Sequence, residues 1–505
     1  MDMQQSPIVG DRKPVEVCGG GTFRADLEFH EASGGASEPV TGREEDVMQR
    51  IEESKDIHRG LSQASAEFLE FVESNPECLE TENFRALEEL EPSIQHDLQI
   101  WPTFVRQDLV QEGAEQAIGL CRLVKTLPER VFENDAEQIG TFYGLDSDAS
   151  HVAVALWKQK DWQKGLLARP DFIHTADGFR CLECNVVGNI GGWEGWYWSE
   201  AYTRIPLIRQ FLDQRKIEPR CTHMVRELLT HIVRQGLRKF RRHPLNIVFL
   251  VREREARPER LIELVAEEYE TLVEKLGISA GRVTLAAVDE VEIQDGQVWV
   301  EGSRVHAAVE MLSGPSSASL YQAWARGKVL LFNGPFTSVL TDKRNLALLS
   351  ELQDSPLFDA EEQEVIRTTV PWTRLVSESP LKPGWSTVTP EGLCQDREHL
   401  VLKPSAALGG QGVLIGGCTE PEAWAQAVDE AFTAGDWIVQ ERVHSQPYVY
   451  YARGRGPVPH NLIFAFFVFG ERFGGGLLRL APQGGTGVVN VTQQAVQGTL
   501  FEVDL

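Results

Sequence analysis

The sequence predicts an α/β fold, and three segments with different residue patterns indicate it. Residues 46–130 carry apolar side chains at three- and four-residue steps, which is typical of helices. Residues 245–340 alternate short β-rich runs with helical stretches, which favours a βαβ layer with a parallel sheet. From residue 399 onward, strands separated by glycine turns dominate. With 505 residues, 42% of them hydrophobic, the chain can bury cores in about three domain-sized units.

The N-terminal part divides into a weakly structured segment, residues 1–45, and a helical region, residues 46–149. Ten of the first forty-five residues are Gly or Pro, which disfavours helices there, although 15–17 and 23–29 could pair as a hairpin. In the helical region we expect Pro128 to end a helix. One buried stripe of that helix is marked by Ala114, Ala117, Ile118, Cys121 and Val124.

The middle of the chain, residues 201–340, is expected to form a Rossmann-like α/β layer. Helices are predicted over 258–275 and 317–326, between apolar runs that are rich in β-branched residues. The four predicted strands are Asn246–Val251, Arg282–Val288, Val305–Leu312 and Lys328–Phe332. We find no internal repeat and no low-complexity tract.

The net charge of −26 excludes several classes of function. Such a field repels phosphate backbones and anionic lipids, so we expect neither nucleic-acid nor membrane binding. The longest apolar run, Leu462–Phe469, is too short to span a bilayer, and the N-terminus shows no secretory signal. Eight cysteines in this length indicate a reducing, cytoplasmic protein. ATP could still bind where metal ions and local cations reverse the field. The oligomeric state is left open.

A glycine-rich loop follows Lys403, which stands at the end of an apolar strand. The loop holds Gly409, Gly410, Gln411 and Gly412, and a second strand begins at Val413. Glycines let backbone N–H groups approach a phosphate, and the lysine adds positive charge. No Gly-Lys-Ser/Thr sequence closes the loop, so it is not the common nucleotide loop. The alternative is a glycine-rich hairpin with a surface lysine.

A buried strand over 436–443 leaves Gln440, Glu441 and Arg442 at its end. Such an end can offer backbone hydrogen bonds to an adenine edge and a carboxylate to ribose hydroxyls. Taken alone, the segment is better explained as an ordinary strand terminus.

Two carboxylates and an amide are predicted to converge near residue 180. Asp171–Asn185 reads as two strands around a turn, and Gly178 suits a three-residue hairpin loop. That loop places Asp171 opposite Glu183, with Asn185 on the same face. Because like charges opposite each other destabilise a sheet, we expect a cation between them, and the all-oxygen ligands favour Mg²⁺. The alternatives are a solvated acidic hairpin, or a two-residue turn that puts Asp171 on the other face.

Two nearby features have structural explanations that we favour. Cys181 and Cys184 form a Cys-x-x-Cys, but side chains three apart in a strand point to opposite faces, which disfavours zinc or redox chemistry. The aromatic patch at Trp193 and Trp196–Trp198 could wall a substrate pocket, but packing in the core between lobes is the slightly better explanation.

These motifs together resemble the ATP-grasp superfamily, over roughly residues 150–505. Its usual members place the nucleotide lobe first, whereas here Glu183-Cys-Asn185 precedes Lys403 by more than two hundred residues. That order resembles the circularly permuted branch, which includes glutathionylspermidine synthase. The segment after Asn185 departs from the usual Asp-Thr-Pro-Thr type, so the substrates are not assigned by the resemblance.

The resemblance implies a fold and a set of roles. Residues 150–200 would form the metal-ligand part, and residues 341–505 the ATP-binding lobe and closing strands. Asp171, Glu183 and Asn185 would bind Mg²⁺. Arg479 and Lys403 would be catalytic. The nucleotide would be held by Lys343, Lys403, Gly409, Gly410, Gln411, Gly412, Gln440, Glu441 and Val443.

The implied activity is ATP-dependent ligation of a small-molecule carboxylate and an amine, through an acylphosphate with release of ADP and phosphate. Two alternatives stay open, a phosphotransferase on the same fold and a non-catalytic ATP-binding protein.

Overall fold

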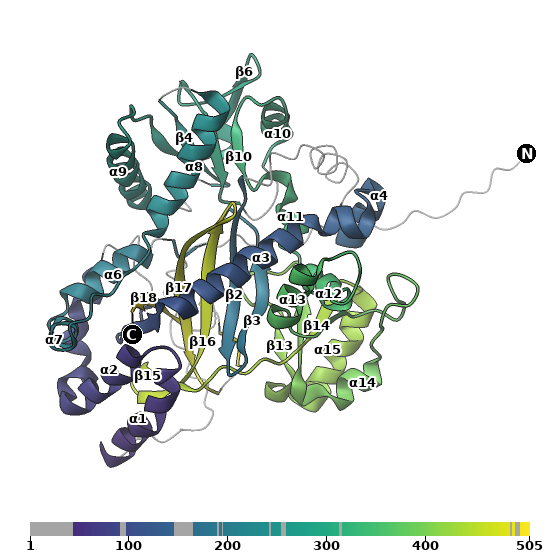
Figure 1. Ribbon diagram of the computed structural model, residues 1–505. Helices are drawn as coiled ribbons and strands as arrows, with labels where there is room; N and C mark the ends of the chain where they lie inside the picture. The colour runs from purple at the N-terminus through teal and green to yellow at the C-terminus, as the bar shows by residue number, and fades with distance from the viewer. Residues whose placement is uncertain are drawn as a thin grey trace, which may run out of the picture. The chain divides into compact units, whose positions relative to one another are not determined.

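A large mixed sheet at the centre of the computed structural model draws strands from distant parts of the chain (Figure 1). Within the described residues it runs β1-β18-β17-β16-β2-β3, and β15 pairs with the beginning of β16. Only β1 and β18 are parallel; the other neighbours are antiparallel. The strands are β1 (Thr103–Arg106), β2 (Leu167–Thr175), β3 (Gly178–Asn185), β15 (Tyr448–Ala452), β16 (Gly456–Phe469), β17 (Arg472–Pro482) and β18 (Val496–Val503).

The structure describes residues 44–90, 97–145, 165–188, 191–193, 195–241, 244–253, 259–312, 316–484, 487–489 and 495–504. The predicted hairpin within residues 15–29 lies outside the described residues, as does nearly all of the segment 1–45 that we expected to be weakly structured.

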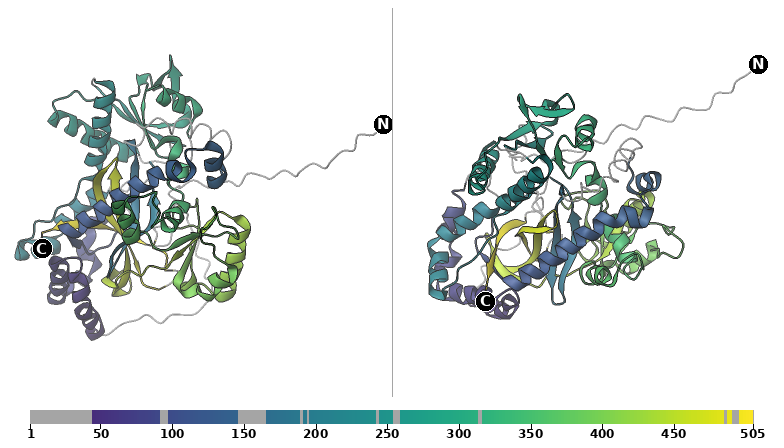
Figure 2. Two further views of the ribbon diagram at one scale, coloured as in Figure 1. Left: turned by 45° about the vertical axis from the view of Figure 1, so that its right-hand side comes forward. Right: turned by 45° about the horizontal axis from the view of Figure 1, so that its top comes forward.

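The helical prediction for residues 46–130 is largely right. Ser62 accepts a hydrogen bond from the Ser65 backbone N–H and so caps the start of one helix. The longest helix covers one face of the large sheet and buries the predicted stripe against it (Figure 2). The helices here are α1 (Glu44–Arg59), α2 (Gln63–Ser74), α3 (Gln107–Phe132) and α4 (Ala136–Tyr143), with 3₁₀ turns η1 (Pro76–Leu79) and η2 (Thr81–Leu87).

Two details of that region differ from the prediction. Helix α3 continues through Pro128 to Phe132, because the last turn buries Val131 and Phe132 and this burial outweighs one lost backbone hydrogen bond. Thr103–Arg106 is a strand, β1, which pairs with β18 from the other end of the chain. A pairing partner nearly four hundred residues away leaves no local signal in the sequence.

The large sheet has two different faces. Phe172 of β2 pairs with Phe464 of β16, and both face α3 in the main hydrophobic core. The packing is close enough that a Cβ added at Gly113 of α3 would lie 2.4 Å from the Phe466 ring. Side chains one position along these strands, such as Asp171, point to the opposite face. The polar groups described below gather on that second face.

The parallel layer forms as predicted from the sequence. All four expected strands are present, in the order β10-β9-β4-β5, and all are parallel. A small antiparallel sheet, β6-β7-β8, was not predicted. The elements are α6 (Gly195–Arg204), α7 (Pro206–Arg215), α8 (Met224–Phe240), β4 (Ile247–Val251), α9 (Glu259–Lys275), β5 (Val283–Ala287), η5 (Val288–Glu290), β6 (Glu292–Gln294), β7 (Gln297–Val300), β8 (Ser303–Arg304), β9 (Ala307–Glu310), α10 (Ala318–Ala325) and β10 (Leu330–Phe332).

A third sheet carries the glycine-rich loop, and we call residues 344–441 the loop lobe. Its antiparallel strands run β11-β14-β12-β13, and α12 and α15 contact them. The elements from the end of the parallel layer through this lobe are η6 (Gly334–Phe336), α11 (Thr337–Leu340), α12 (Arg344–Glu351), α13 (Ala360–Thr369), β11 (Thr373–Leu375), α14 (Pro390–Gln395), η7 (Arg397–His399), β12 (Leu400–Pro404), β13 (Leu414–Ile415), η8 (Gly416–Cys418), α15 (Pro421–Ala434) and β14 (Trp437–Glu441).

None of the helices in the described part of the chain combines the length and the apolar character needed to cross a bilayer.

A buried carboxyl, Glu310, stands at the end of β9 in the parallel layer. Its side chain is 5% exposed, and its Oε1 has no hydrogen-bond partner among the described residues. Burial raises the pKa of Glu310 to about 7, although Ser316, Tyr321 and the Gly334 backbone act in the opposite direction. The folded protein therefore holds this proton more tightly than the unfolded chain does.

We predict that Glu310 makes the stability of the fold pH-dependent. Its stabilising contribution is complete below its usual pKa of 4.5 and is lost as the pH rises toward 7. At pH 8 the buried carboxyl of Glu310 is ionised at a cost in stability, whereas at pH 4.5 it is protonated. Glu310→Gln removes that cost, so its effect on the free energy of unfolding should be more stabilising at pH 8 than at pH 4.5, by roughly 3 kcal/mol. Urea denaturation at both pH values measures this. Glu270→Gln, on the exposed face of α9, is the control; an equal effect of Glu310→Gln at both pH values would refute the assignment.

Candidate functional site

The β2–β3 hairpin places Asp171 opposite Glu183, as predicted, but by a different route. Thr175 pairs with Gly178, so the turn has two residues and the expected three-residue loop is wrong. A β-bulge at Leu182 then adds one residue to β3 and shifts the register back. The two-residue turn alone would have put the two carboxylates on opposite faces.

The same bulge explains the two cysteines of β3. Because Leu182 adds one residue, Cys181 and Cys184 both face α3, which corrects the expectation of opposite faces. They lie in the core beside Cys121. Burial raises the pKa of Cys181, and a hydrogen bond with Cys121 together with burial raises the pKa of Cys184. Buried thiols with raised pKa values are unreactive. The cysteines therefore have a packing role.

An amide lies between the two carboxylates. The Asn185 Nδ2 is 3.2 Å from Asp171 Oδ2 and 3.2 Å from Glu183 Oε1. A half-turn of this amide exchanges its nitrogen and oxygen, which would direct three oxygen atoms at one point. Three oxygens of this kind suit a hard cation such as Mg²⁺. Across the described residues, no preformed cluster of three His, Cys, Asp or Glu side chains is found.

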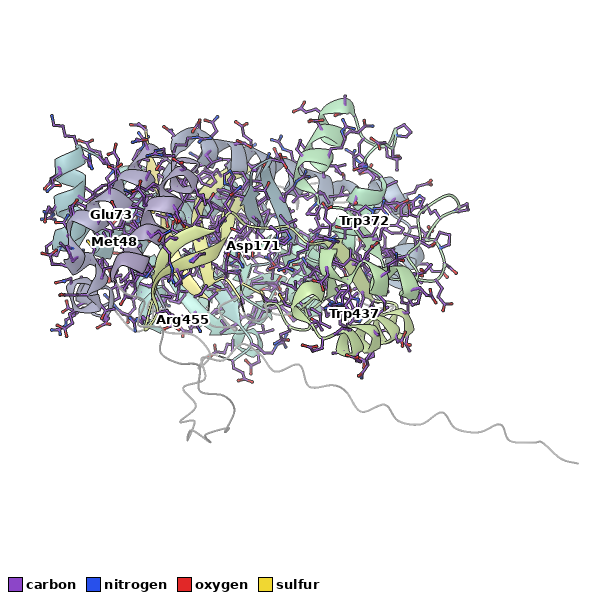
Figure 3. The ribbon with its side chains drawn as sticks, turned by 90° about the horizontal axis from the view of Figure 1, so that it is seen from below. Met48, Glu73, Asp171, Trp372, Trp437 and Arg455 are labelled. Carbon is purple, nitrogen blue, oxygen red and sulfur yellow. The ribbon has the colours of Figure 1, made fainter. Side chains whose placement is uncertain are left out.

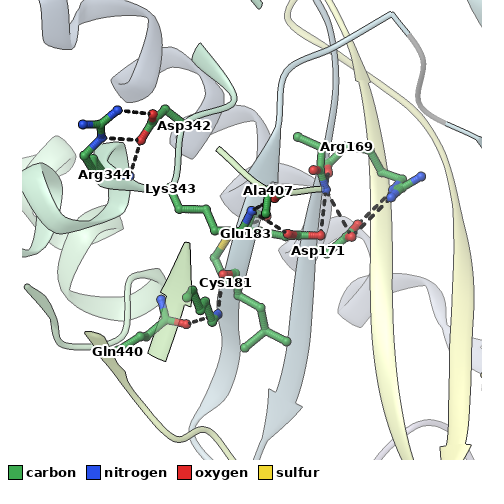
Figure 4. Close-up of polar contacts among 12 residues, drawn as sticks. Arg169, Asp171, Cys181, Glu183, Asp342, Lys343, Arg344, Ala407 and Gln440 are labelled. Atoms are coloured by element: carbon green, nitrogen blue, oxygen red, sulfur yellow. Dashed lines mark hydrogen bonds and ion pairs between the residues drawn. The ribbon is translucent and has the colours of Figure 1, made fainter. Parts of the chain in front are cut away.

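Two arginines hold Asp171, which is 1% exposed (Figure 4). Arg169 donates to it from Nε at 2.9 Å and from Nη2 at 3.3 Å, and Arg479 donates from Nη1 at 3.1 Å. Sequence reasoning identified Arg479 and missed Arg169. A signal was available, because Arg169 lies two positions before Asp171 and must therefore share its face of the strand.

Two lysines approach Glu183 from the loop lobe and its border. Lys343 Nζ lies 3.7 Å from Glu183 Oε2 and hydrogen-bonds the carbonyl oxygen of Ala407. Lys403 Nζ donates to the carbonyl oxygen of Leu182, the bulge residue, at 3.0 Å. The bulge therefore places Asp171 opposite Glu183, and its backbone carbonyl also binds the lysine of the loop lobe.

Burial and charge pull the pKa values of this cluster in opposite directions. Burial alone would raise the pKa of Glu183, but Lys343, Asn185, Lys403 and Arg479 outweigh it and hold the pKa at about 2. Burial lowers the pKa of Lys403 to about 8, although Glu183 opposes that shift. Glu183 is therefore ionised at neutral pH.

The cluster carries a positive excess. Four cationic side chains, those of Arg169, Lys343, Lys403 and Arg479, surround the carboxylates of Asp171 and Glu183. The Nε of Arg479 is buried and has no hydrogen-bond partner among the described residues. In a chain with a net charge of −26, this is a local reversal of the field. A polyanion is the ligand that such an excess attracts.

The glycine-rich loop has the predicted strand–loop–strand form. Strands β12 and β13 pair as a hairpin, with Val401 opposite Ile415. Gly409, Gly410 and Gly412 have φ of +67°, +73° and +70°, a region that favours glycine. At Gly412 a Cβ would also approach Pro404 to 2.7 Å. The conformation therefore requires these glycines, while Gln411 at the tip is exposed.

The predicted nucleoside residues lie at the end of β14. Gln440 is fully buried, where its Oε1 accepts from Lys403 at 2.6 Å and its Nε2 donates to Thr373 at 3.1 Å. Its amide therefore positions Lys403. Glu441 is exposed, and its Oε1 accepts from the backbone N–H of Trp372 at 3.0 Å.

A cleft joins these groups. It contains about 940 Å³ of non-protein space, part of it open to solvent. Asp171, Glu183, Lys343, Lys403 and Arg479 line one part of it, with Gly410 of the loop. Its apolar wall is formed by Ile173, Val401, Val413, Ile415, Val443 and Ile463. Of the predicted site residues, the cleft brings together the charged groups, the loop and the end of β14. Asn185 contacts both carboxylates but does not line the cleft.

Comparisons with known proteins give matches among solved structures alone. No protein-family profile matches the chain, and no curated protein does. Among solved structures, a glutathione synthetase-like effector from Globodera pallida in its apo form aligns with a TM-score of 0.48 and 12% identity. The alignment covers 80% of this chain and 90% of that one.

We predict that the two carboxylates differ in their importance for stability. Asp171→Asn leaves Arg169 and Arg479 without their buried counter-charge, so it should lower the free energy of unfolding by about 3–5 kcal/mol. Glu183→Gln should lower it by less, roughly 2–3 kcal/mol, because the cations that hold the Glu183 pKa at about 2 lose a counter-charge while Lys343 keeps its bond to Ala407. Urea denaturation of both variants measures this. A loss in Asp171→Asn no larger than in Glu183→Gln would contradict the assigned ion pairing.

Proposed function

We propose that this protein is an ATP-dependent carboxylate–amine ligase of the circularly permuted ATP-grasp type. One observation carries the proposal. A carboxylate pair, three cationic side chains and a glycine-rich loop line one cleft, and they come from the large sheet, the loop lobe and its border. Asn185 and Arg169 contact the carboxylates from outside the lining of the cleft. A magnesium nucleotide requires oxygen ligands for the metal ion and, beside them, positively charged side chains for the phosphates.

Asp171, Glu183 and Asn185 would hold Mg²⁺. The fit is supported by the donor set and by the place of the Asn185 amide, which lies between two carboxylates where a cation would relieve their repulsion. Bound magnesium would supply neutralisation of phosphate oxygens. With the carboxylates directed at such a cation, Arg169 and Arg479 would lose part of their pairing with Asp171, and their N–H groups would be available to phosphate.

Lys403, Lys343 and residues 409–412 would bind the phosphates. Lys403 is held by Gln440 and by the Leu182 carbonyl, so its ammonium group is fixed before a ligand arrives. That fixed position lowers the entropy cost of binding. Beyond the phosphates, Glu441 and Val443 would contact the nucleoside, with Gln440 acting through Lys403.

The reaction follows from these positions. An oxygen of the substrate carboxylate attacks the γ-phosphorus, the bond to the β–γ bridging oxygen breaks, and ADP leaves. Arg479 and Lys403 stabilise the charge that develops on the transferring group. An amine then attacks the acyl carbon, the bond to the phosphate oxygen breaks, and the nitrogen gives up its proton as the amide forms. Phosphoryl transfer of this kind needs positioning and charge neutralisation and no covalent protein nucleophile.

The order of elements supports the permuted arrangement. The strands that carry the carboxylates, β2 and β3, precede the loop lobe in sequence, and β16 and β17 follow it. Yet β16 lies directly between β2 and β17 in the large sheet. The site is therefore completed by strands from both sides of the loop lobe.

We predict ADP, not AMP, as the nucleotide product. With Mg²⁺, ATP, a mixture of amino acids and short peptides, and hydroxylamine, the enzyme should release ADP and phosphate and form a hydroxamate. AMP with pyrophosphate would overturn the acylphosphate route. ADP with a stable phosphorylated product would identify a phosphotransferase, and nucleotide binding without turnover would favour a non-catalytic ATP-binding protein.

We predict a binding role for Lys403 as well. Lys403→Met should weaken ATP binding by about ten- to hundredfold, since a hydrogen bond to a charged group contributes about 1.5–3 kcal/mol. Calorimetric titration of ATP into both proteins measures this. Lys382→Met, which removes a lysine from the loop lobe outside the cleft, is the control. Unchanged affinity in a folded Lys403→Met variant would exclude Lys403 from the phosphate site.

A further inference from the structure

Two polar groups beside the proposed nucleotide cleft are buried without a hydrogen bond, although they complement each other. The Nε of Arg479 is a donor that has no partner among the described residues. The Oε1 of Gln497 is an acceptor, and it likewise has no partner in the described part of the chain. A buried polar group that stays unpaired costs free energy, so such groups are rare in folded proteins. A matching donor and acceptor side by side suggest a bond that forms in another state of the protein.

The register of the large sheet places these two groups on one face. Arg479 of β17 and Gln497 of β18 are direct partners in an antiparallel pairing. Directly opposite side chains point to the same face, with Cβ atoms about 5 Å apart. That face also carries Asp171, because Arg479 binds Asp171 across β16. The Oε1 of Gln497 can therefore reach the Nε of Arg479 by side-chain rotation alone.

Arg479 lies between two acceptors, and in the structure it uses one of them. Its Nη1 donates to Asp171 at 3.1 Å, which directs the guanidinium group toward β2. Gln497 lies on the other side of Arg479, because β18 and β16 flank β17 on opposite edges. The bond to Asp171 thus leaves the Nε of Arg479 without an acceptor.

The backbone of Gln497 is held on both edges of its strand. Its N–H donates to the carbonyl oxygen of Asp97 at 2.7 Å, and its carbonyl oxygen accepts from the N–H of Gln99 at 2.8 Å. On the other edge, β18 pairs with β17. Gln497 is only 7% exposed. Its amide is therefore placed beside Arg479 by the fold and needs little further ordering to accept a bond.

Gln497 lies on the side of Arg479 that faces away from the loop lobe. In Figure 3, Asp171 lies between Glu73 of α2 and Trp437 of the loop lobe. Strand β1, the neighbour of β18, packs against α2, so β18 lies toward the Glu73 side. Arg479 lines the cleft, whereas Gln497 is not among the described residues that line it. A bond to Gln497 would hold Arg479 from behind, without contact to a nucleotide.

The charge of Arg479 is poorly compensated. Burial lowers its pKa, and Arg169 adds to this effect, although Asp171 and Glu183 oppose it. If Asp171 is directed at a cation, as the proposed function requires, Arg479 loses its bond to that carboxylate. A neutral acceptor at Nε would then keep the guanidinium group in place while its two terminal nitrogens donate to an anion.

We propose that Gln497 is a positioning residue for Arg479 in the nucleotide-bound protein. The proposal rests on the ligase function above. When Asp171 turns to the metal ion, Arg479 leaves Asp171 and donates from Nε to the Oε1 of Gln497. Nη1 and Nη2 then donate to phosphate oxygens. The bond between Arg479 and Gln497 therefore forms only while metal ion and nucleotide are both bound.

Gln497→Met tests the proposal, because methionine has a similar length and lacks the amide. Calorimetric titration of a non-hydrolysable ATP analogue with Mg²⁺ should show about tenfold weaker binding to this variant, since a hydrogen bond to a charged group is lost. Without Mg²⁺ its affinity should equal that of the wild-type protein. Thr499→Val is the control and should bind as the wild-type protein does in both conditions. Thr499 shares the face of Gln497 and buries an unpaired Oγ1, but it lies opposite Leu477.

Urea denaturation without ligand supplies a second measurement. Gln497→Met should be at least as stable as the wild-type protein, because the amide oxygen has no bond to lose. A less stable or unfolded variant would show that the amide already supports the fold, and this would overturn the proposal. Unchanged affinity with Mg²⁺, or equal weakening with and without Mg²⁺, would overturn it too.

The wild-type protein separates these outcomes from failure of the ligase function. If Mg²⁺ tightens nucleotide binding equally in the wild-type protein and in Gln497→Met, only the role of Gln497 is lost. If the wild-type protein binds no nucleotide, the proposed function itself is wrong.

Discussion

One buried carboxylate, Asp171, holds the centre of the molecule together by pairing with Arg169 of its own strand and Arg479 of β17. Two guanidinium groups that share one carboxylate in a sheet interior are stable only while all three remain in place. The pairing links β2 to a strand that lies three hundred residues later in the chain. The bulge at Leu182 adds Glu183 to this network, and Lys403 connects it to the loop lobe.

This cluster concentrates positive charge in one place, although the protein as a whole is negatively charged. The cluster has more cations than carboxylates, and each cation is held by a neutral or acidic group of the fold, as Lys403 is by Gln440. A magnesium nucleotide could replace the internal ion pairs of such a cluster. The carboxylates would bind the metal ion, and the cationic side chains that they release would bind the phosphates. The internal ion pairs thus keep the site ordered without a ligand and set the charge pattern that a ligand must match.

Local patterns predicted much of the fold, and long-range pairing explains what they missed. The strands of the parallel layer and the hairpin around Gly409–Gly412 carry their own signals, so the sequence was sufficient for them. Strand β1 depends on β18, and α3 passes Pro128 because of what it packs against. The pairing of Asp171 with Glu183 was predicted correctly, but from a three-residue loop that is not present. A two-residue turn with a bulge at Leu182 gives the same pairing, and counting residues cannot distinguish the two. Arg169 was missed although its spacing from Asp171 pointed to it.

The most direct test of this account is the coupling between magnesium and nucleotide at Glu183. The affinity of a non-hydrolysable ATP analogue would be measured by calorimetric titration, with and without Mg²⁺, in the wild-type protein and in Glu183→Gln. We predict that Mg²⁺ tightens binding at least tenfold, a difference of about 1.4 kcal/mol, in the wild-type protein and has little effect in the variant. Equal affinity with and without Mg²⁺ in the wild-type protein, or no binding at all, would contradict it.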